Sequence, residues 1–225
     1  MLDQDLSAVS RVVLSNTDFF GPPQIAIEGN ILYPTAERRI AALASLFEGY
    51  DLEICLAIRN PATWLNDLYG SSGAQSFSTF LPQTDPMQLR CSHLFARLQR
   101  AFPQIKFTLW CDEDTPVLWG GIMRRMAGLP PGTRITGAFD MLANVITQDG
   151  YRQFRTYLKA RANLNHEQRM RAALAFLRKY AKPEAIEQEI TIPEWDENTV
   201  TALTTLYEDD LGQISQIDGV RLLAL

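Results

Sequence analysis

The sequence predicts an α/β protein with a mainly parallel sheet and a helical C-terminal half. In the first half of the 225 residues, short apolar runs alternate with amphipathic stretches. The run at residues 52–58 is apolar except for Glu53, as expected of a strand covered on both faces of a parallel sheet, and residues 105–110 are expected to form another strand. After Thr133 the segments have helical periodicity. Strand and helix alternating in this order favours parallel strands joined by crossover helices.

The expected elements follow one another along the chain with recognisable boundaries. Asn60 caps a helix that has Pro61 at its first position, where a missing N–H costs nothing. Strands are expected at residues 11–15, 52–58, 105–110 and 220–225. Helices are expected after Thr35, at 61–69, from Asp85 to 102, from Asp114 or Thr115 to Met126, and at 139–146, 149–160, 166–181 and 197–217.

The prediction for domain organisation is one α/β domain over residues 1–225. Residues 1–132 form its sheet-and-helix core, and residues 133–225 form a helical elaboration packed on that core. No flexible linker rich in glycine, serine or proline divides the two halves.

Composition and charge narrow the range of functions. The net charge is −5, and no basic run tracks a phosphate backbone, so no nucleic-acid partner is expected. No apolar run reaches the roughly 18 residues of a membrane helix, and the acidic N-terminus differs from a signal peptide. The three cysteines cannot all pair within one chain and have no metal-binding spacing, which indicates a reduced, cytoplasmic protein. The lack of a long apolar run predicts no membrane partner.

The most informative stretch is DLEICLAIRNPATWLNDLY, which joins a predicted strand to an Arg59-Asn60-Pro61 turn and a helix. The turn places a guanidinium and the N–H groups of a helix N-terminus at the carboxyl end of the strand. Both features favour an anion.

Residues 57–69, AIRNPATWLNDLY, resemble the second nucleotide-binding segment of the sulfotransferases that use 3′-phosphoadenosine 5′-phosphosulfate (PAPS). Residues 108–130 are similar to that family's next strand, Glu-Asp turn and long helix. The resemblance implies a P-loop sulfotransferase fold and sulfuryl transfer from PAPS to a hydroxyl or amine. The C-terminal helices are similar in character to those of bacterial members. It implies that Arg59 binds the donor's 3′-phosphate, with backbone N–H groups from Asn60 onward.

Two departures from the family change what the resemblance implies. Asp67 stands where the family has a serine, and a carboxylate there repels the phosphate or pairs with Arg59. The phosphosulfate-binding loop of Gly, Lys, Ser and Thr is also absent, because only ten residues precede Arg11. The first βα unit is therefore expected to be missing.

Two interpretations remain open. The chain is either part of a longer PAPS-dependent enzyme, or a non-enzymatic binding or assembly module on a degenerate sulfotransferase fold. In both cases this chain alone is expected to be inactive and to need no cofactor, PAPS being the donor only in a longer form. Without a first βα unit, the strand at residues 11–15 is expected to have an open edge, which favours a homo-oligomer.

Asp18 and two acidic runs are the other carboxylates that could take part in chemistry. Asp18 is the candidate general base, and its alternative role is a turn-forming residue. Asp112, Glu113 and Asp114 suggest a metal ion by composition, but three consecutive carboxylates cannot face one point, and a helix cap is the simpler role. The run from Glu208 to Asp210 is expected to form a solvated helix face.

Overall fold

The computed structural model describes residues 9–130 and 132–225. These residues form two compact units. The sheet unit comprises residues 17–113 and 188–224, and the helical unit comprises residues 114–187 with the described residues before 17 and residue 225. Residues 114–187 therefore interrupt the sheet unit in sequence.

The sheet unit contains a parallel sheet of three strands in the order β3-β4-β5, which confirms the α/β fold class. β3 and β4 pair along their full length, from Glu53 opposite Lys106 to Ile58 opposite Cys111. A small antiparallel hairpin, β1 with β2, precedes the sheet. The strands are β1 (Ile27–Glu28), β2 (Ile31–Leu32), β3 (Glu53–Ile58), β4 (Lys106–Cys111) and β5 (Val220–Leu223).

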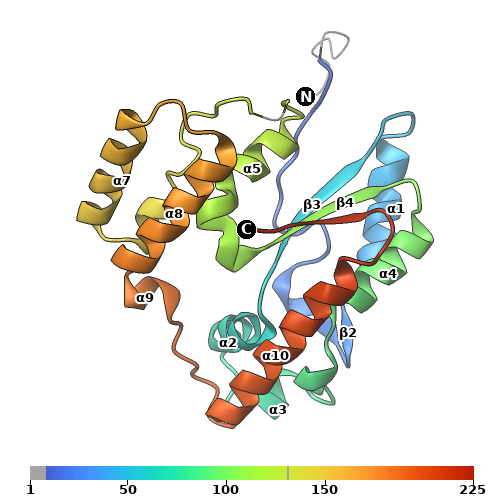
Figure 1. Cartoon of the computed structure of the whole chain (residues 1–225). Coiled ribbons are helices and arrows are strands. Elements are labelled where there is room, and N and C mark those ends of the chain that lie inside the picture. Colours follow the sequence, from blue (N-terminus) through green and yellow to red (C-terminus); the bar gives the residue numbers. More distant parts are fainter. Residues whose placement is uncertain (1–8, 131) are drawn as a thin grey trace. The chain divides into compact units, whose positions relative to one another are not determined.

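Helices of the sheet unit enclose one hydrophobic core around the central strand. Phe95 and Phe107 are fully buried, with ring centroids 5.7 Å apart, and α10 packs against α2 and α4 (Figure 1). The helices of this unit are α1 (Ala36–Leu46), α2 (Pro61–Ser72), α3 (Phe77–Phe80), α4 (Cys91–Ala101) and α10 (Glu197–Ile214), with short turns η2 (Pro23–Ile25), η3 (Pro86–Gln88) and η4 (Asp112–Asp114).

The helical unit has its own core, centred on Phe139, Leu142, Ile146 and Phe154. In Figure 1, α7 and α8 lie side by side as an antiparallel pair. Gly150 allows this approach, because a Cβ at that position would collide with the side chain of Tyr180. The helices are α5 (Thr115–Met126), α6 (Leu142–Val145), α7 (Gln148–Ala160), α8 (His166–Tyr180) and α9 (Pro183–Ile186).

Several sequence-based boundaries are confirmed, and three are wrong. The final strand, the strands near residues 52 and 105, and the helices α5, α7, α8 and α10 lie where they were expected. The helix expected from Asp85 to residue 102 is broken, because Leu89 and Arg90 are extended and α4 begins only at Cys91. The helix expected at residues 139–146 is reduced to Leu142–Val145.

The third wrong prediction is the strand at residues 11–15, which is irregular in the structure. Val12, Val13 and Leu14 are all about half exposed, so the segment has no alternation of buried and exposed side chains. The guanidinium of Arg11 donates instead to the carbonyl of Met126 at the end of α5, at 3.3 Å. Residues 11–15 therefore offer no strand edge, and a homo-oligomer through an exposed sheet edge stays a prediction.

Among the described residues, no helix is both long enough and apolar enough to cross a membrane.

Candidate functional site

The turn from β3 into α2 is built by local sequence, as expected. The strand ends at the buried Ile58, and the side chain of Asn60 accepts a hydrogen bond from the N–H of Ala62 at 2.9 Å. Pro61 occupies the first position of the helix. This turn fixes Arg59 at the carboxyl end of β3, beside the N-terminus of α2.

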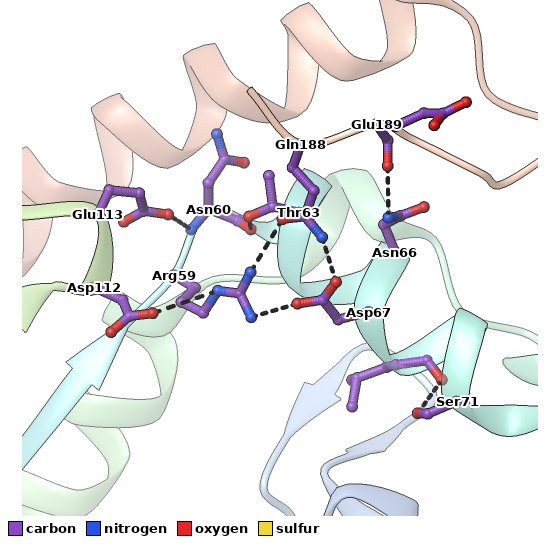
Figure 2. Close-up of polar contacts among 11 residues, drawn as sticks. Arg59, Asn60, Thr63, Asn66, Asp67, Ser71, Asp112, Glu113, Gln188 and Glu189 are labelled. Atoms are coloured by element: carbon purple, nitrogen blue, oxygen red, sulfur yellow. Dashed lines mark hydrogen bonds and ion pairs between the residues drawn. The ribbon is translucent and has the colours of Figure 1, made fainter. Parts of the chain in front are cut away.

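Arg59 is surrounded by acceptors from its own chain (Figure 2). Its Nη1 lies 2.7 Å from Oδ2 of Asp67, and its Nε lies 3.7 Å from Oδ2 of Asp112. Its Nη2 donates to Oε1 of Gln188 at 3.2 Å, while Nε2 of Gln188 donates to the second oxygen of Asp67. We call these four residues the Arg59 cluster. Two carboxylates therefore face one guanidinium, and the cluster carries a net negative charge.

The N–H groups at the start of α2 are likewise satisfied within the chain. The N–H of Asn60 donates to Oε1 of Glu113 at 2.8 Å, and the N–H of Thr63 donates to the carbonyl of Asn60 at 3.1 Å. The N–H of Ala62 binds the Asn60 side chain, and Pro61 has no N–H. A helix N-terminus attracts anions through such donors. At this helix Glu113 already supplies the anion.

Helix α10 fixes the turn from the other side. Nδ2 of Asn60 donates to the hydroxyl of Thr204 at 2.9 Å, and the hydroxyl of Tyr207 contacts the carbonyl of Ile58 at 3.3 Å and Oε2 of Glu113 at 3.4 Å. Burial raises the pKa of Tyr207, and a hydrogen bond with Cys111 and the negative charge of Glu113 raise this pKa further. Tyr207 is therefore a neutral hydroxyl that holds Glu113 at the turn.

A second asparagine on α2 positions Gln188. The buried Asn66 donates through Nδ2 to the carbonyl of Glu189 at 3.0 Å and accepts from the N–H of Thr191 at 2.7 Å. These bonds hold the returning segment against α2, next to Asp67 (Figure 2). Sequence reasoning missed Gln188, because no motif connects a residue in this segment with a helix more than a hundred positions earlier.

The structure brings Arg59, Asn60 and Asp67 together and places Asp18 in a separate turn. The Thr17 hydroxyl donates to Oδ1 of Asp18 at 3.2 Å, and the carbonyl of Asp18 accepts from the N–H of Gly21 and from Arg39, each at 3.1 Å. These bonds are the contacts of a turn residue. None of these bonds joins Asp18 to the Arg59 cluster. The role of Asp18 as a general base stays a prediction.

The acidic residues after β4 point to different partners, as their consecutive positions require. Asp112 lies beside Arg59 and Glu113 binds the N–H of Asn60. No group of three or more potential ligand side chains that could hold a metal ion occurs among the residues that the structure describes.

The expectation of a solvated face from Glu208 to Asp210 is wrong for Asp210. Glu208 and Asp209 are exposed, but only 3% of Asp210 is exposed. Its carboxylate accepts from the N–H groups of Cys91 at 2.7 Å and Ser92 at 3.2 Å, and from the Ser92 hydroxyl. Asp210 thus caps α4 from α10.

We expect stability to fall at alkaline pH because of Cys91. Burial is the largest cause, and together with the negative charge of Asp210 it raises the pKa of the Cys91 thiol from 9.0 to about 12. Between these values the unfolded chain ionises while the folded chain keeps its proton. The free energy of unfolding therefore falls by about 1.4 kcal/mol per pH unit as the pH rises above 9.

Urea unfolding between about pH 8 and about pH 11 measures this effect. Cys91→Ser should remove one such contribution from the slope, because serine does not ionise. A slope equal to that of the wild type would mean that Cys91 does not titrate as described.

Comparison with family models, with curated proteins and with solved structures found no match to this chain. The geometry therefore defines the class: an α/β protein with a three-strand parallel sheet and an internally neutralised arginine at the carboxyl end of β3.

Proposed function

We propose that this chain is a non-enzymatic binding or assembly module on a fold that resembles the PAPS-dependent sulfotransferases. One observation carries the proposal: the guanidinium that the resemblance assigns to a phosphate is bound by Asp67 and approached by Asp112. The chain's own carboxylates occupy the position of the anion.

The two carboxylates beside Arg59 would repel a bound phosphate. A phosphate carries nearly two negative charges at neutral pH. Each like-charge pair at about 4 Å costs about 1 kcal/mol in water and about 4 kcal/mol near a protein surface. A 3′-phosphate beside Arg59 would face Asp67 and Asp112 together. Glu113 also holds the N–H of Asn60, so the phosphate would gain few new donors.

The second candidate is sulfuryl transfer by a longer form of the protein. The side chain of Arg59 is 30% exposed and that of Asp67 is 46% exposed. A partly exposed ion pair contributes little to stability and can separate. In this form Asp67 would leave Arg59, and a donor-binding loop from outside residues 1–225 would bind the phosphosulfate of PAPS.

Calorimetric titration with adenosine 3′,5′-bisphosphate tests the proposal. The wild-type chain should bind with a dissociation constant above about 1 mM. Asp67→Ser removes one carboxylate and restores the residue type of the family, so its dissociation constant should be at least tenfold lower, from a gain of about 1.4 kcal/mol or more.

Asp51→Ser is the matched control, because Asp51 is an exposed aspartate just before β3. It should bind the nucleotide as weakly as the wild type does. Micromolar binding by the wild-type chain, or turnover of PAPS by it, would overturn the proposal and support the enzyme.

A further inference from the structure

Charge is divided unequally between the two units. Residues 114–187 contain 12 Lys and Arg against 6 Asp and Glu, a net charge of +6, although the whole chain has a net charge of −5. Charges separated by more than about 8 Å are largely screened at physiological ionic strength. A partner that contacts the helical unit therefore meets an excess of positive charge, although the net charge of the whole chain is negative.

The excess positive charge is concentrated on the antiparallel pair α7 and α8 and the turn between them. Arg152 pairs with Asp149 at 3.4 Å, and Arg171 pairs with Glu167. Five other exposed cations of α7, α8 and the turn between them, all of them residues that the structure describes, have no carboxylate partner. We call these five the basic surface: Arg155, Lys159, Arg161, Arg178 and Lys179.

Aromatic rings connect the cations of the two helices. The guanidinium of Arg161 lies over the ring of Tyr157, 4.1 Å from its centroid. The Tyr157 ring contacts Phe176, which stacks on Tyr180 at 5.7 Å, and Nζ of Lys179 lies 5.1 Å from the Tyr180 centroid. A continuous line of partly buried rings thus crosses both helices, with a cation at each end.

The combination of cations and rings fits single-stranded nucleic acid. Phosphates of a single strand bind Arg and Lys, and its unpaired bases stack on aromatic rings and guanidinium planes. An anionic membrane fits less well, because none of the large apolar side chains of α7 and α8 is exposed for insertion. Phe154, on the apolar side of α7, is 1% exposed and belongs to the core.

We propose that the basic surface of α7 and α8 binds single-stranded nucleic acid, with phosphates at its five cations and a base stacked at Arg161 and Tyr157. This proposal departs from the expectation based on the net charge of the chain. It is also independent of the proposal for the Arg59 cluster, because all residues of the basic surface belong to the helical unit.

Fluorescence anisotropy with a labelled oligothymidylate of about 20 nucleotides tests the proposal. Five phosphate contacts give a slope of about −3.5 for log K against log salt concentration. The affinity should therefore fall about 100-fold between about 50 mM and about 200 mM salt. The combined variant Arg155→Gln, Arg161→Gln, Lys179→Gln should lose about 2 units of this slope and bind more weakly at low salt.

The matched control removes three exposed cations, again two Arg and one Lys, from the sheet unit: Arg38→Gln, Arg100→Gln, Lys106→Gln. It should bind as the wild type does, and circular dichroism should show both variants folded. Three outcomes would overturn the proposal: no binding at low salt, equal losses in the two variants, or tighter binding to phosphatidylserine vesicles or polyglutamate than to the oligonucleotide.

Discussion

Phe107→Ala is expected to lower the free energy of unfolding of the sheet unit by about 3–5 kcal/mol. Phe107 is fully buried on β4, the central strand, where it is paired with Ile54 on β3 and Val220 on β5. Its ring packs against Phe95 on α4 at a centroid distance of 5.7 Å. Truncation removes this contact and leaves a cavity in the centre of the core, where neighbours on both sides are fixed by the sheet.

Urea unfolding followed by tryptophan fluorescence measures the loss, since Trp64, Trp110 and Trp195 all lie in the sheet unit. Leu46→Ala is the control, because Leu46 ends α1 with 72% of its surface exposed. We expect this control to change stability by less than about 0.5 kcal/mol. A loss of under 1 kcal/mol for Phe107→Ala would show that the core around β4 is not packed as described.

The elements that the sequence predicted well depend on signals contained within them. The β3 and β4 strands are six-residue segments in which apolar side chains predominate, and α2 begins with a side-chain cap and a proline. Gly73, with φ of +70°, ends α2 in a conformation that favours glycine. Each of these signals lies within the element or at its ends, so no tertiary contact was needed to recognise it.

The elements that the sequence predicted wrongly depend on distant partners. Residues 11–15 have strand composition, but a strand also needs a neighbour, and the Arg11 guanidinium binds carbonyls at the end of α5 instead. The hairpin of β1 and β2 has only two residues in each strand, too few for an alternating pattern. Helix α4 begins at Cys91 because its cap, Asp210, comes from α10.

The residues of the candidate site also differ in whether local sequence predicts their position. Arg59, Asn60 and Asp67 lie within nine residues, and the periodicity of α2 brings Asp67 back to Arg59. Asp112 and Glu113 follow β4, the strand parallel to β3. They therefore reach the same edge of the sheet as Arg59 and Asn60, which follow β3. Gln188 and Thr204 arrive from the C-terminal segment, and nothing in their own sequence indicates this destination.

The second large expected effect concerns Asp210, and we expect Asp210→Ala to reduce the free energy of unfolding by about 2–4 kcal/mol. The N-cap position of α4 is held by Arg90, whose side chain makes no capping hydrogen bond. Asp210 replaces this missing cap with bonds to the N–H groups of Cys91 and Ser92 and to the Ser92 hydroxyl. Its loss would leave these buried donors without an acceptor and remove a negative charge from a helix N-terminus.

Asp209→Ala separates this role from an effect of helix charge or propensity, because Asp209 precedes Asp210 on α10 and is exposed. It should change stability by less than about 0.5 kcal/mol. Asp210→Asn keeps one acceptor oxygen but not the charge, so its loss should fall between the two alanine variants. If Asp210→Ala cost no more than Asp209→Ala, α4 would be held by its packing against α10 alone. The larger loss instead means that one buried carboxylate joins the two helices that flank the β3 turn, and that α10 keeps Tyr207 and Thr204 in place beside Arg59 and Asn60.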